Sequence, residues 1–287
     1  CGDLAVDPAF ESDVVQTVAS VSPSSGRGVY LSDFFADADD ELIGCIRCRN
    51  AKPFHLDLKM AFQPIVDVDT RTVFAYEALV RGAQGASAGE VLAAVAPEEM
   101  YSFDQTCRVL AIETAQRLGM STYLSINFLP NAVYEPATCI RLTLAAARKV
   151  GFPPDRLIFE LTEGEKIHDP AHALRIIKDY QQRGFLTAID DFGAGYSGLN
   201  LLAEFQPHIV KLDMALTRDI DRDPVRRAIV GGVIGTCKAL GCQIVAEGIE
   251  TPQELDTLRG MGVSMFQGYL LARPQVEALP EPDLTYC

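Results

Sequence analysis

The stretch LTAIDDFGAGYSGLNLL, residues 186–202, places two adjacent aspartates between an apparent β-strand and a glycine-rich loop. Gly193, Gly195 and Gly198 spell the G-x-G-x-x-G pattern of dinucleotide-binding folds, and the letters D-F-G also occur in protein kinases. A pyrophosphate on this loop would face two carboxylates without charge compensation, and a dinucleotide-binding strand normally ends in apolar residues. The H-R-D and V-A-I-K motifs of kinases are absent from the chain. Neither pattern therefore accounts for the aspartates.

We interpret Asp190 and Asp191 as metal ligands instead. One carboxylate can hold two divalent ions roughly 3.5 to 4 Å apart, an arrangement that activates water and stabilises the leaving oxygen in phosphodiester cleavage. The glycines that follow let the loop fold tightly beside such a site. The pair therefore predicts a metal bridge in a phosphodiester-cleaving site.

Polar side chains recur at the ends of the other predicted strands, one every 20 to 50 residues. A single strand-end acid is commonly a surface contact, but a series at equivalent positions indicates one shared site. Five carboxylates in one place would repel each other unless cations compensated them. Oxygen ligands in that number favour Mg²⁺ or Mn²⁺ over zinc, whose usual His and Cys ligands are missing from the set. The series consists of Glu77, Asn127, Glu160, Asp190, Asp191, Lys211, Glu247 and Gln267.

A regular alternation of strands and helices must position these side chains. From Met60 onward, short β-branched runs alternate with helical patterns, beginning with a hairpin around residues 69–71. Repeated βα units over about 230 residues predict a parallel sheet that closes into a (β/α)₈ barrel. After the hairpin, strands are predicted at 123–129, 157–163, 186–192, 208–214, 243–249 and 265–271, and helices at 103–119, 170–184 and 224–241.

Composition limits the classes of function. The 287 residues are 48% hydrophobic and 22% charged, enough for a full core. The net charge of -14, from 39 acidic and 25 basic residues, disfavours a nucleic acid polymer as partner, so a small phosphate ligand would need metal ions as counter-charge. No apolar run approaches the roughly 18 residues of a membrane span. We expect a cytoplasmic protein without a membrane span.

Residues 1–55 differ in composition from the rest and contain no recognisable catalytic motif. They include the linker-like VSPSSGRG and the acidic DFFADADDEL, so we expect an N-terminal segment or linker followed by a barrel over 56–287. The eight cysteines are predicted to be mostly buried thiols. Cys45 and Cys48 have C-x-x-C spacing, but no second pair completes a zinc or haem site, which leaves a redox or metal role as the lesser alternative. Because Cys1 stands where Met would begin a chain, we expect a fragment.

Eight ordered motifs between about Met60 and Pro274 resemble those of the EAL-domain phosphodiesterases that hydrolyse bacterial cyclic di-GMP. The resemblance implies a barrel with an inverted, antiparallel first strand, two Mg²⁺ or Mn²⁺ ions per active site, and linear pGpG as the product. It also implies a homodimer, formed through the loop after the paired aspartates and its neighbouring helix. The motifs are FQPIVD, YEALVRG, INFLP, FELTE, AIDDFGAGYSGL, IVKLD, VAEGIE and FQGYLLARP.

The resemblance also implies a role for each matching residue. Lys211 would orient or help deprotonate the attacking water, and Gln267 would assist that water or the substrate. Glu163 would brace the glycine-rich loop. Arg81 would line the cyclic dinucleotide, since its planar fork suits a phosphate. Gln63, Leu79 and Gln267 would also contact the substrate; Glu77, Asn127, Glu160 and Asp190 would hold one metal; Asp190, Asp191 and Glu247 would hold the other.

Departures from the family pattern are small. Ala194 and Gly198 stand where Thr and Ser are frequent, and neither would contribute a metal ligand, so we expect an active enzyme. Ca²⁺ should allow substrate binding but inhibit turnover, because it prefers looser coordination than Mg²⁺. Two alternatives remain: a catalytically silent cyclic di-GMP receptor, and a signalling scaffold that docks a partner through residues 1–55. The scaffold leaves the full acidic set unexplained.

Overall fold

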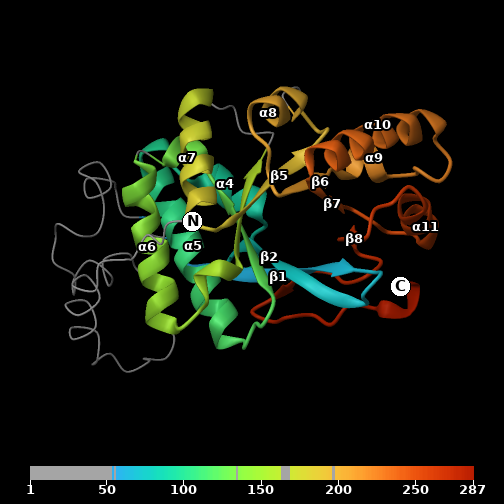
Figure 1. The fold of residues 1–287 in the computed structure, drawn as a ribbon. Coiled ribbons are helices and arrows are strands. Elements are labelled where there is room, and N and C mark those ends of the chain that lie inside the picture. Colours follow the sequence, from blue (N-terminus) through green and yellow to red (C-terminus); the bar gives the residue numbers. More distant parts are fainter. Residues whose placement is uncertain (1–53, 55, 134, 163–168, 196–197) are drawn as a thin grey trace, which may run out of the picture.

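Eight strands close into a barrel in the computed structural model, which describes residue 54 and residues 56–133, 135–162, 169–195 and 198–287 (Figure 1). β1 (Leu58–Asp67) is antiparallel to both of its barrel neighbours, β2 (Thr72–Gly82) and β8 (Met265–Phe266), and the other neighbouring pairs are parallel. The predicted barrel with an inverted first strand is therefore confirmed. The remaining barrel strands are β3 (Tyr123–Phe128), β4 (Leu157–Thr162), β5 (Leu186–Phe192), β6 (Ile209–Leu212) and β7 (Gln243–Ala246), and β9 (Gln275–Val276) pairs with β1 outside the barrel.

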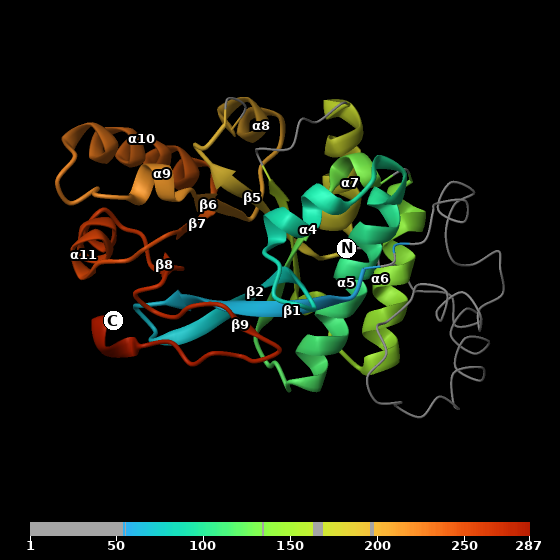
Figure 2. The same ribbon diagram turned by 180° about the vertical axis from the view of Figure 1, so that it is seen from behind.

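The predicted hairpin joins β1 to β2. The Asp67 carboxylate accepts the backbone N–H groups of Asp69 and Thr70, which stabilises the turn. Arg71 completes the turn with a φ of 57° and donates hydrogen bonds to the carbonyl oxygens of Leu284 and Cys287. The hairpin end is thereby tied to the C-terminal segment, which runs along β1 in both views (Figures 1 and 2).

Helices cover the outside of the barrel, with α5, α6 and α7 gathered on one side, α9, α10 and α11 on the other, and α8 between the two groups (Figure 2). Their ends follow ordinary capping rules: Asp223 caps the backbone at the start of α10, and Gly241 ends that helix with a φ of 75°. The predicted helices at 103–119, 170–184 and 224–241 are confirmed. The helices are α4 (Ala88–Ala94), α5 (Met100–Arg117), α6 (Pro136–Val150), α7 (Pro170–Gln182), α8 (Gly198–Glu204), α9 (Met214–Thr217), α10 (Pro224–Leu240) and α11 (Pro252–Gly260).

The strand predicted at 265–271 is too long, because β8 ends at Phe266. Gly268 approaches Ile249 so closely that an added Cβ would lie 2.1 Å from the Ile249 carbonyl oxygen. The Leu270 N–H donates to that same carbonyl, so the chain turns here instead of extending. An apolar run in sequence cannot reveal this backbone contact.

An apolar layer fills the barrel below the polar strand ends. It consists of one residue from most of the strands, and these residues pack against each other. Side chains alternate along a strand, so the residue two positions further on points into the same interior, one layer higher. The layer contains Ile65, Ala75, Ile158, Ala188, Ile209, Val245 and Met265.

Three of the cysteines are buried free thiols, as predicted: Cys139, Cys237 and Cys242. Cys107 and Cys287 are partly exposed, and Cys45 and Cys48 lie outside the described residues. Among the helices that the structure describes, none has the length and apolar character needed to cross a membrane.

Candidate active site

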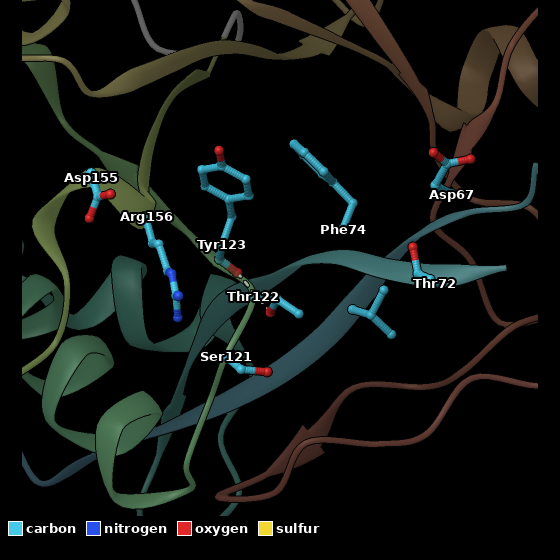
Figure 3. A pocket seen from close by; sticks show the side chains of 9 residues that line it. Asp67, Thr72, Phe74, Ser121, Thr122, Tyr123, Asp155 and Arg156 are labelled. Atoms are coloured by element: carbon cyan, nitrogen blue, oxygen red, sulfur yellow. Dashed lines mark hydrogen bonds between the residues drawn. The ribbon is translucent and has the colours of Figure 1, made fainter. Parts of the chain in front are cut away.

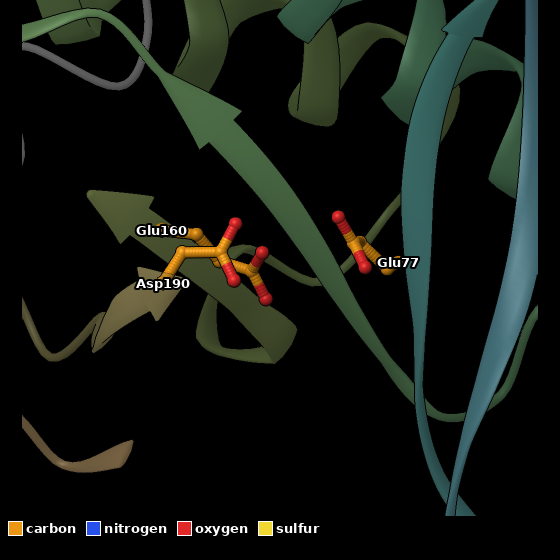
Figure 4. Close-up of side chains that lie close together, drawn as sticks. All are labelled: Glu77, Glu160 and Asp190. Atoms are coloured by element: carbon orange, nitrogen blue, oxygen red, sulfur yellow. The ribbon is translucent and has the colours of Figure 1, made fainter. Parts of the chain in front are cut away.

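The predicted site residues converge at one end of the barrel interior. Glu77, Glu160 and Asp190 each follow a residue of the apolar layer by two positions, so strand alternation turns all three carboxylates inward. All three are buried, and one oxygen of each lies within 4.8 Å of the others (Figure 4). Asn127 joins this group by donating from Nδ2 to Glu77 Oε1 at 3.0 Å. Three carboxylates at successive intervals of 83 and 30 positions along the chain thus form one acidic cluster.

A second cluster shares Asp190 and adds Asp191 and Glu247, again with oxygens within 4.8 Å of one another. Consecutive strand residues ordinarily point to opposite faces, so two adjacent aspartates cannot both face the interior of a regular strand. Asp191 has a φ of 53°, and the pairing of β5 with β6 loses its regular register between Ile189 and Phe192. This local irregularity, of a kind found next to active sites, brings both carboxylates to the same place.

Lys211 lies at the centre of both clusters. Its side chain is 1% exposed, and its ammonium group contacts Glu160 at 2.9 Å, Asp190 at 2.8 Å and Glu77 at 3.3 Å. It also lies 2.9 Å from Glu247. The Asp190 contact is an ion pair without good hydrogen-bond direction, because Asp190 Oδ1 has no hydrogen-bond partner. One cation therefore partly compensates carboxylates from four different strand ends.

Burial has the largest effect on the pKa values of Asp191 and Glu247. It raises the pKa of Asp191 to about 6, with a further increase from the charge of Asp190. Burial likewise raises the pKa of Glu247 well above its usual value, although Lys211 acts in the opposite direction. Acids that resist ionisation in this way lack sufficient positive charge nearby.

Inside the barrel, the pKa values of Glu160 and Glu77 shift in opposite directions. Burial raises the pKa of Glu160 to about 8, and the lowering effect of Lys211 only partly offsets it. The pKa of Glu77 is lowered, because the charge of Lys211 and hydrogen bonds from Gln267 and Asn127 outweigh its burial. The cluster as a whole remains short of positive charge, which a bound divalent cation would supply.

Gln267 and Gln63 complete the interior. Gln267 Nε2 donates to Glu77 Oε2 at 2.7 Å and to Gln63 Oε1 at 3.3 Å, while Gln63 donates to the Ala272 carbonyl. The amide oxygen of Gln267 is buried without a hydrogen-bond partner among the described residues. It therefore offers an acceptor for a bound molecule.

Two of the predicted substrate contacts lie beyond Glu77 on the same face of β2. Leu79 and Arg81 follow Glu77 at alternating positions and are half-buried. Arg81 Nη1 donates to the Val80 carbonyl at 2.7 Å. Glu163 lies outside the described residues, so its role as a loop brace stays a prediction.

Two supporting residues were missed from the sequence. Ser125 donates a short hydrogen bond to Glu160 Oε1, and it could have been found because it lies two residues before Asn127 on the same face of β3. Thr217 donates to the Glu247 carbonyl at 2.6 Å from the end of α9. That contact joins separate elements and has no signal in the sequence.

The donor set fits hard divalent ions. Glu77, Asn127, Glu160 and Asp190 can supply oxygen ligands to one ion, and Asp190, Asp191 and Glu247 to a second. The buried acids with raised pKa values favour such cations, and the described members of both clusters are carboxylates.

A cavity of about 380 Å³ lies at the opposite end of the barrel, where β2 and β3 begin (Figure 3). Phe74 and Tyr123 stand side by side in it, with Arg156 next to Tyr123 and Asp67 on the far side. The carboxylate clusters are not among its lining residues. Barrel enzymes carry their chemistry at the carboxyl ends of the strands, so this cavity is separate from the candidate active site.

Comparison with known proteins gives a consistent family. Residues 51–274 match the EAL domain family. The blue light- and temperature-regulated antirepressor BluF of Escherichia coli is 32% identical over 249 residues, which are 86% of this chain and 60% of BluF. The cyclic di-GMP phosphodiesterase RocR of Pseudomonas aeruginosa is 34% identical over 171 residues, which are 60% of this chain and 43% of RocR. The chain therefore spans about half the length of these curated relatives.

Solved structures resemble the fold closely. A standalone versatile EAL protein from Vibrio cholerae, in a form bound to c-di-GMP, superposes with a TM-score of 0.79 at 48% identity, covering 81% of this chain and 98% of that one. The manganese and cyclic di-GMP complex of BlrP1 from Klebsiella pneumoniae gives a TM-score of 0.74 at 37% identity, covering 81% of this chain and 60% of BlrP1.

Proposed function

The chain belongs to the EAL-domain family, and we propose that it hydrolyses cyclic di-GMP to linear pGpG with two divalent cations. One observation carries the proposal: two acidic clusters share Asp190, as a carboxylate bridge between two ions requires. The related proteins named as cyclic di-GMP phosphodiesterase and as a manganese complex support both substrate and metal. Mg²⁺ or Mn²⁺ is the expected cofactor.

Each residue has a distinct task in this proposal. The bound cations would lower the pKa of a water molecule and stabilise the leaving oxygen. Lys211 holds the carboxylates together and orients the attacking water, while Gln267, through its unpaired amide oxygen, accepts a hydrogen bond from that water or from the substrate. Gln63 is paired with Glu77 across β1 and β2, and Leu79 and Arg81 lie two and four residues further along β2, where the dinucleotide would bind.

The direct test is product analysis. Purified protein is incubated with cyclic di-GMP and Mg²⁺ or Mn²⁺, and nucleotides are separated by chromatography. We expect pGpG with either ion and bound but unhydrolysed substrate in Ca²⁺. Substrate binding without pGpG under every metal condition would replace the enzyme by the receptor.

The receptor is the second candidate, and one comparison favours it: BluF, a relative that covers 86% of this chain, is named an antirepressor. A receptor needs the substrate groove but not all of the metal ligands. The complete acidic set favours the enzyme, because an unbound cluster of carboxylates is costly to bury.

We also propose a homodimer through α8, the helix that follows the loop after the paired aspartates, with α10 contributing further exposed apolar side chains. Leu199 on α8 is 66% exposed, and Val225 and Ile229 on α10 are 65% and 50% exposed. Both helices lie along the upper edge of the molecule in the two views (Figures 1 and 2). Sedimentation of Ile229→Asp against wild type tests the dimer, since a buried charge at an apolar interface should favour the monomer.

A further inference from the structure

A buried ion pair lies behind the active site, on α5. Arg108 Nη2 is 2.7 Å from Asp104 Oδ2, and the two side chains are 0% and 1% exposed. The cost of removing both charges from water largely cancels their attraction, so such a pair adds little net stability. A role in positioning other groups therefore explains the pair better than a role in stability, and its contacts show which groups these are.

Arg108 holds the outer faces of two strands. Its guanidinium carbon lies 5.5 Å from the ring centre of Phe128 and 5.7 Å from that of Phe159, close enough for cation–π attraction. Its Nη1 donates to the Tyr180 hydroxyl on α7 at 2.9 Å. The two rings also pack edge to face with each other.

Those two phenylalanines are direct chain neighbours of site residues. Phe128 follows Asn127 on β3, and Phe159 precedes Glu160 on β4. Because strand side chains alternate, rings held on the outer face set the direction of the polar side chains on the inner face. Asn127 and Glu160 are also paired across the two strands. The guanidinium group of Arg108 therefore contacts the ring next to each of these two site residues.

Asp104 holds the end of β3. Its Oδ1 accepts the Leu129 N–H at 3.0 Å, two residues beyond Asn127. Its other oxygen pairs with Arg108 and accepts from Gln105. The Asp104 carboxylate thus connects Arg108, which contacts the two rings, to the residue that follows the end of β3.

We propose that Asp104 and Arg108 are positioning residues for the cation site formed by Glu77, Asn127, Glu160 and Asp190. The inference rests on the proposed two-cation function. The ion pairs, hydrogen bonds and cation–π contacts described above join the pair to α5, β3 and its following loop, β4 and α7, whereas Asp191 lies at the end of β5 and Glu247 follows β7. The pair therefore acts on one cation site and not on the other.

The test is a Mn²⁺ titration of the whole chain, without substrate, by electron paramagnetic resonance of free Mn²⁺ and by calorimetry. The double variant Asp104→Leu/Arg108→Met replaces the ion pair by apolar side chains, a change that commonly leaves stability intact. We expect wild type to bind two ions, and the variant to bind one of them roughly 10- to 100-fold more weakly. Val230→Ala, at a fully buried position on α10, is the control for a general loss of packing.

Each outcome decides the matter. Two wild-type affinities in the folded double variant overturn the inference, and so does an equal weakening of both sites that Val230→Ala reproduces. If the double variant does not fold, Tyr180→Phe takes its place, since it removes only the hydroxyl contact with Arg108. It should weaken one site about two- to tenfold, and unchanged binding overturns the inference. Wild type that binds no Mn²⁺ overturns the two-cation proposal itself, before any variant is considered.

Discussion

The two halves of the candidate site are built by different means. In the inner half, Glu77 and Glu160 project from within β2 and β4, are 5% and 1% exposed, and are held by side-chain contacts. In the outer half, Asp191 and Glu247 lie at strand ends and are aimed by backbone conformation, with positive φ at Asp191 and Gly248. The inner half therefore depends on strand packing, whereas the outer half depends on turns, and changes to packing or to turns should affect different cations.

Asp190 belongs to both halves, so its loss should have the largest effect. Asp190→Asn removes the charge shared by the two clusters, and turnover of cyclic di-GMP should fall by roughly three orders of magnitude or more. Rate measurements over a range of Mn²⁺ concentrations check this, with binding of both ions weakened together. Activity near that of wild type would refute the shared bridge.

Lys211 also touches both halves, through Glu77, Glu160, Asp190 and Glu247. If it orients the nucleophilic water, Lys211→Met should lower kcat roughly 100-fold or more with KM nearly unchanged. A structural ion pair instead predicts a loss of folded protein without metal, because the carboxylates lose their only close described cation. Circular dichroism with and without Mg²⁺ separates the two, and an unfolded variant that Mg²⁺ refolds to full activity contradicts the catalytic role.

The outer half should be sensitive to its glycines. Gly248→Ala places a Cβ 2.4 Å from Met214 Cβ at a φ of 65°, which should displace Glu247 and weaken one cation about tenfold. Gly119→Ala is the matched control, with a φ of 71° and open space around the added Cβ. Mn²⁺ titration of both variants is the measurement. Equal Mn²⁺ affinities in the two variants would contradict the prediction that the turn at Gly248 positions Glu247.

The smallest effect concerns pH and the metal-free protein. Burial raises the pKa of Glu160 from 4.5 to about 8 and that of Asp191 from 3.8 to about 6. A raised pKa in the folded state contributes stability that is present below the ordinary value and is lost as the pH rises through the folded value. The Tm in a chelator should therefore fall between about pH 4 and pH 8, and Mg²⁺ should restore it most at pH 8. The lowered pKa of Glu77 acts only below 4.5 and cannot mask this. A chelated Tm that is constant over this range would contradict the assigned directions.

Much of the fold was predictable because local patterns carry it. The order of strands and helices follows from periodicity and turn residues, and polar groups at successive strand ends must meet once a parallel barrel closes. The hairpin, the long helices and the convergence of Glu77, Asn127 and Glu160 were predictable on these grounds. Asp104 and Arg108 also left a signal, since an oppositely charged pair one turn apart lies beside apolar positions such as Val109 and Ala111.

The sequence by itself determined the barrel, the acidic set and the chemistry that such a set favours, because side-chain type and spacing along the chain suffice for these. Only the tertiary structure decided how the two adjacent aspartates face one site, since a positive φ at Asp191 overrides strand alternation. It also decided that β8 ends at Phe266 and that Lys211 pairs with four carboxylates. These features depend on contacts between segments far apart in the chain, whose distances no local pattern encodes.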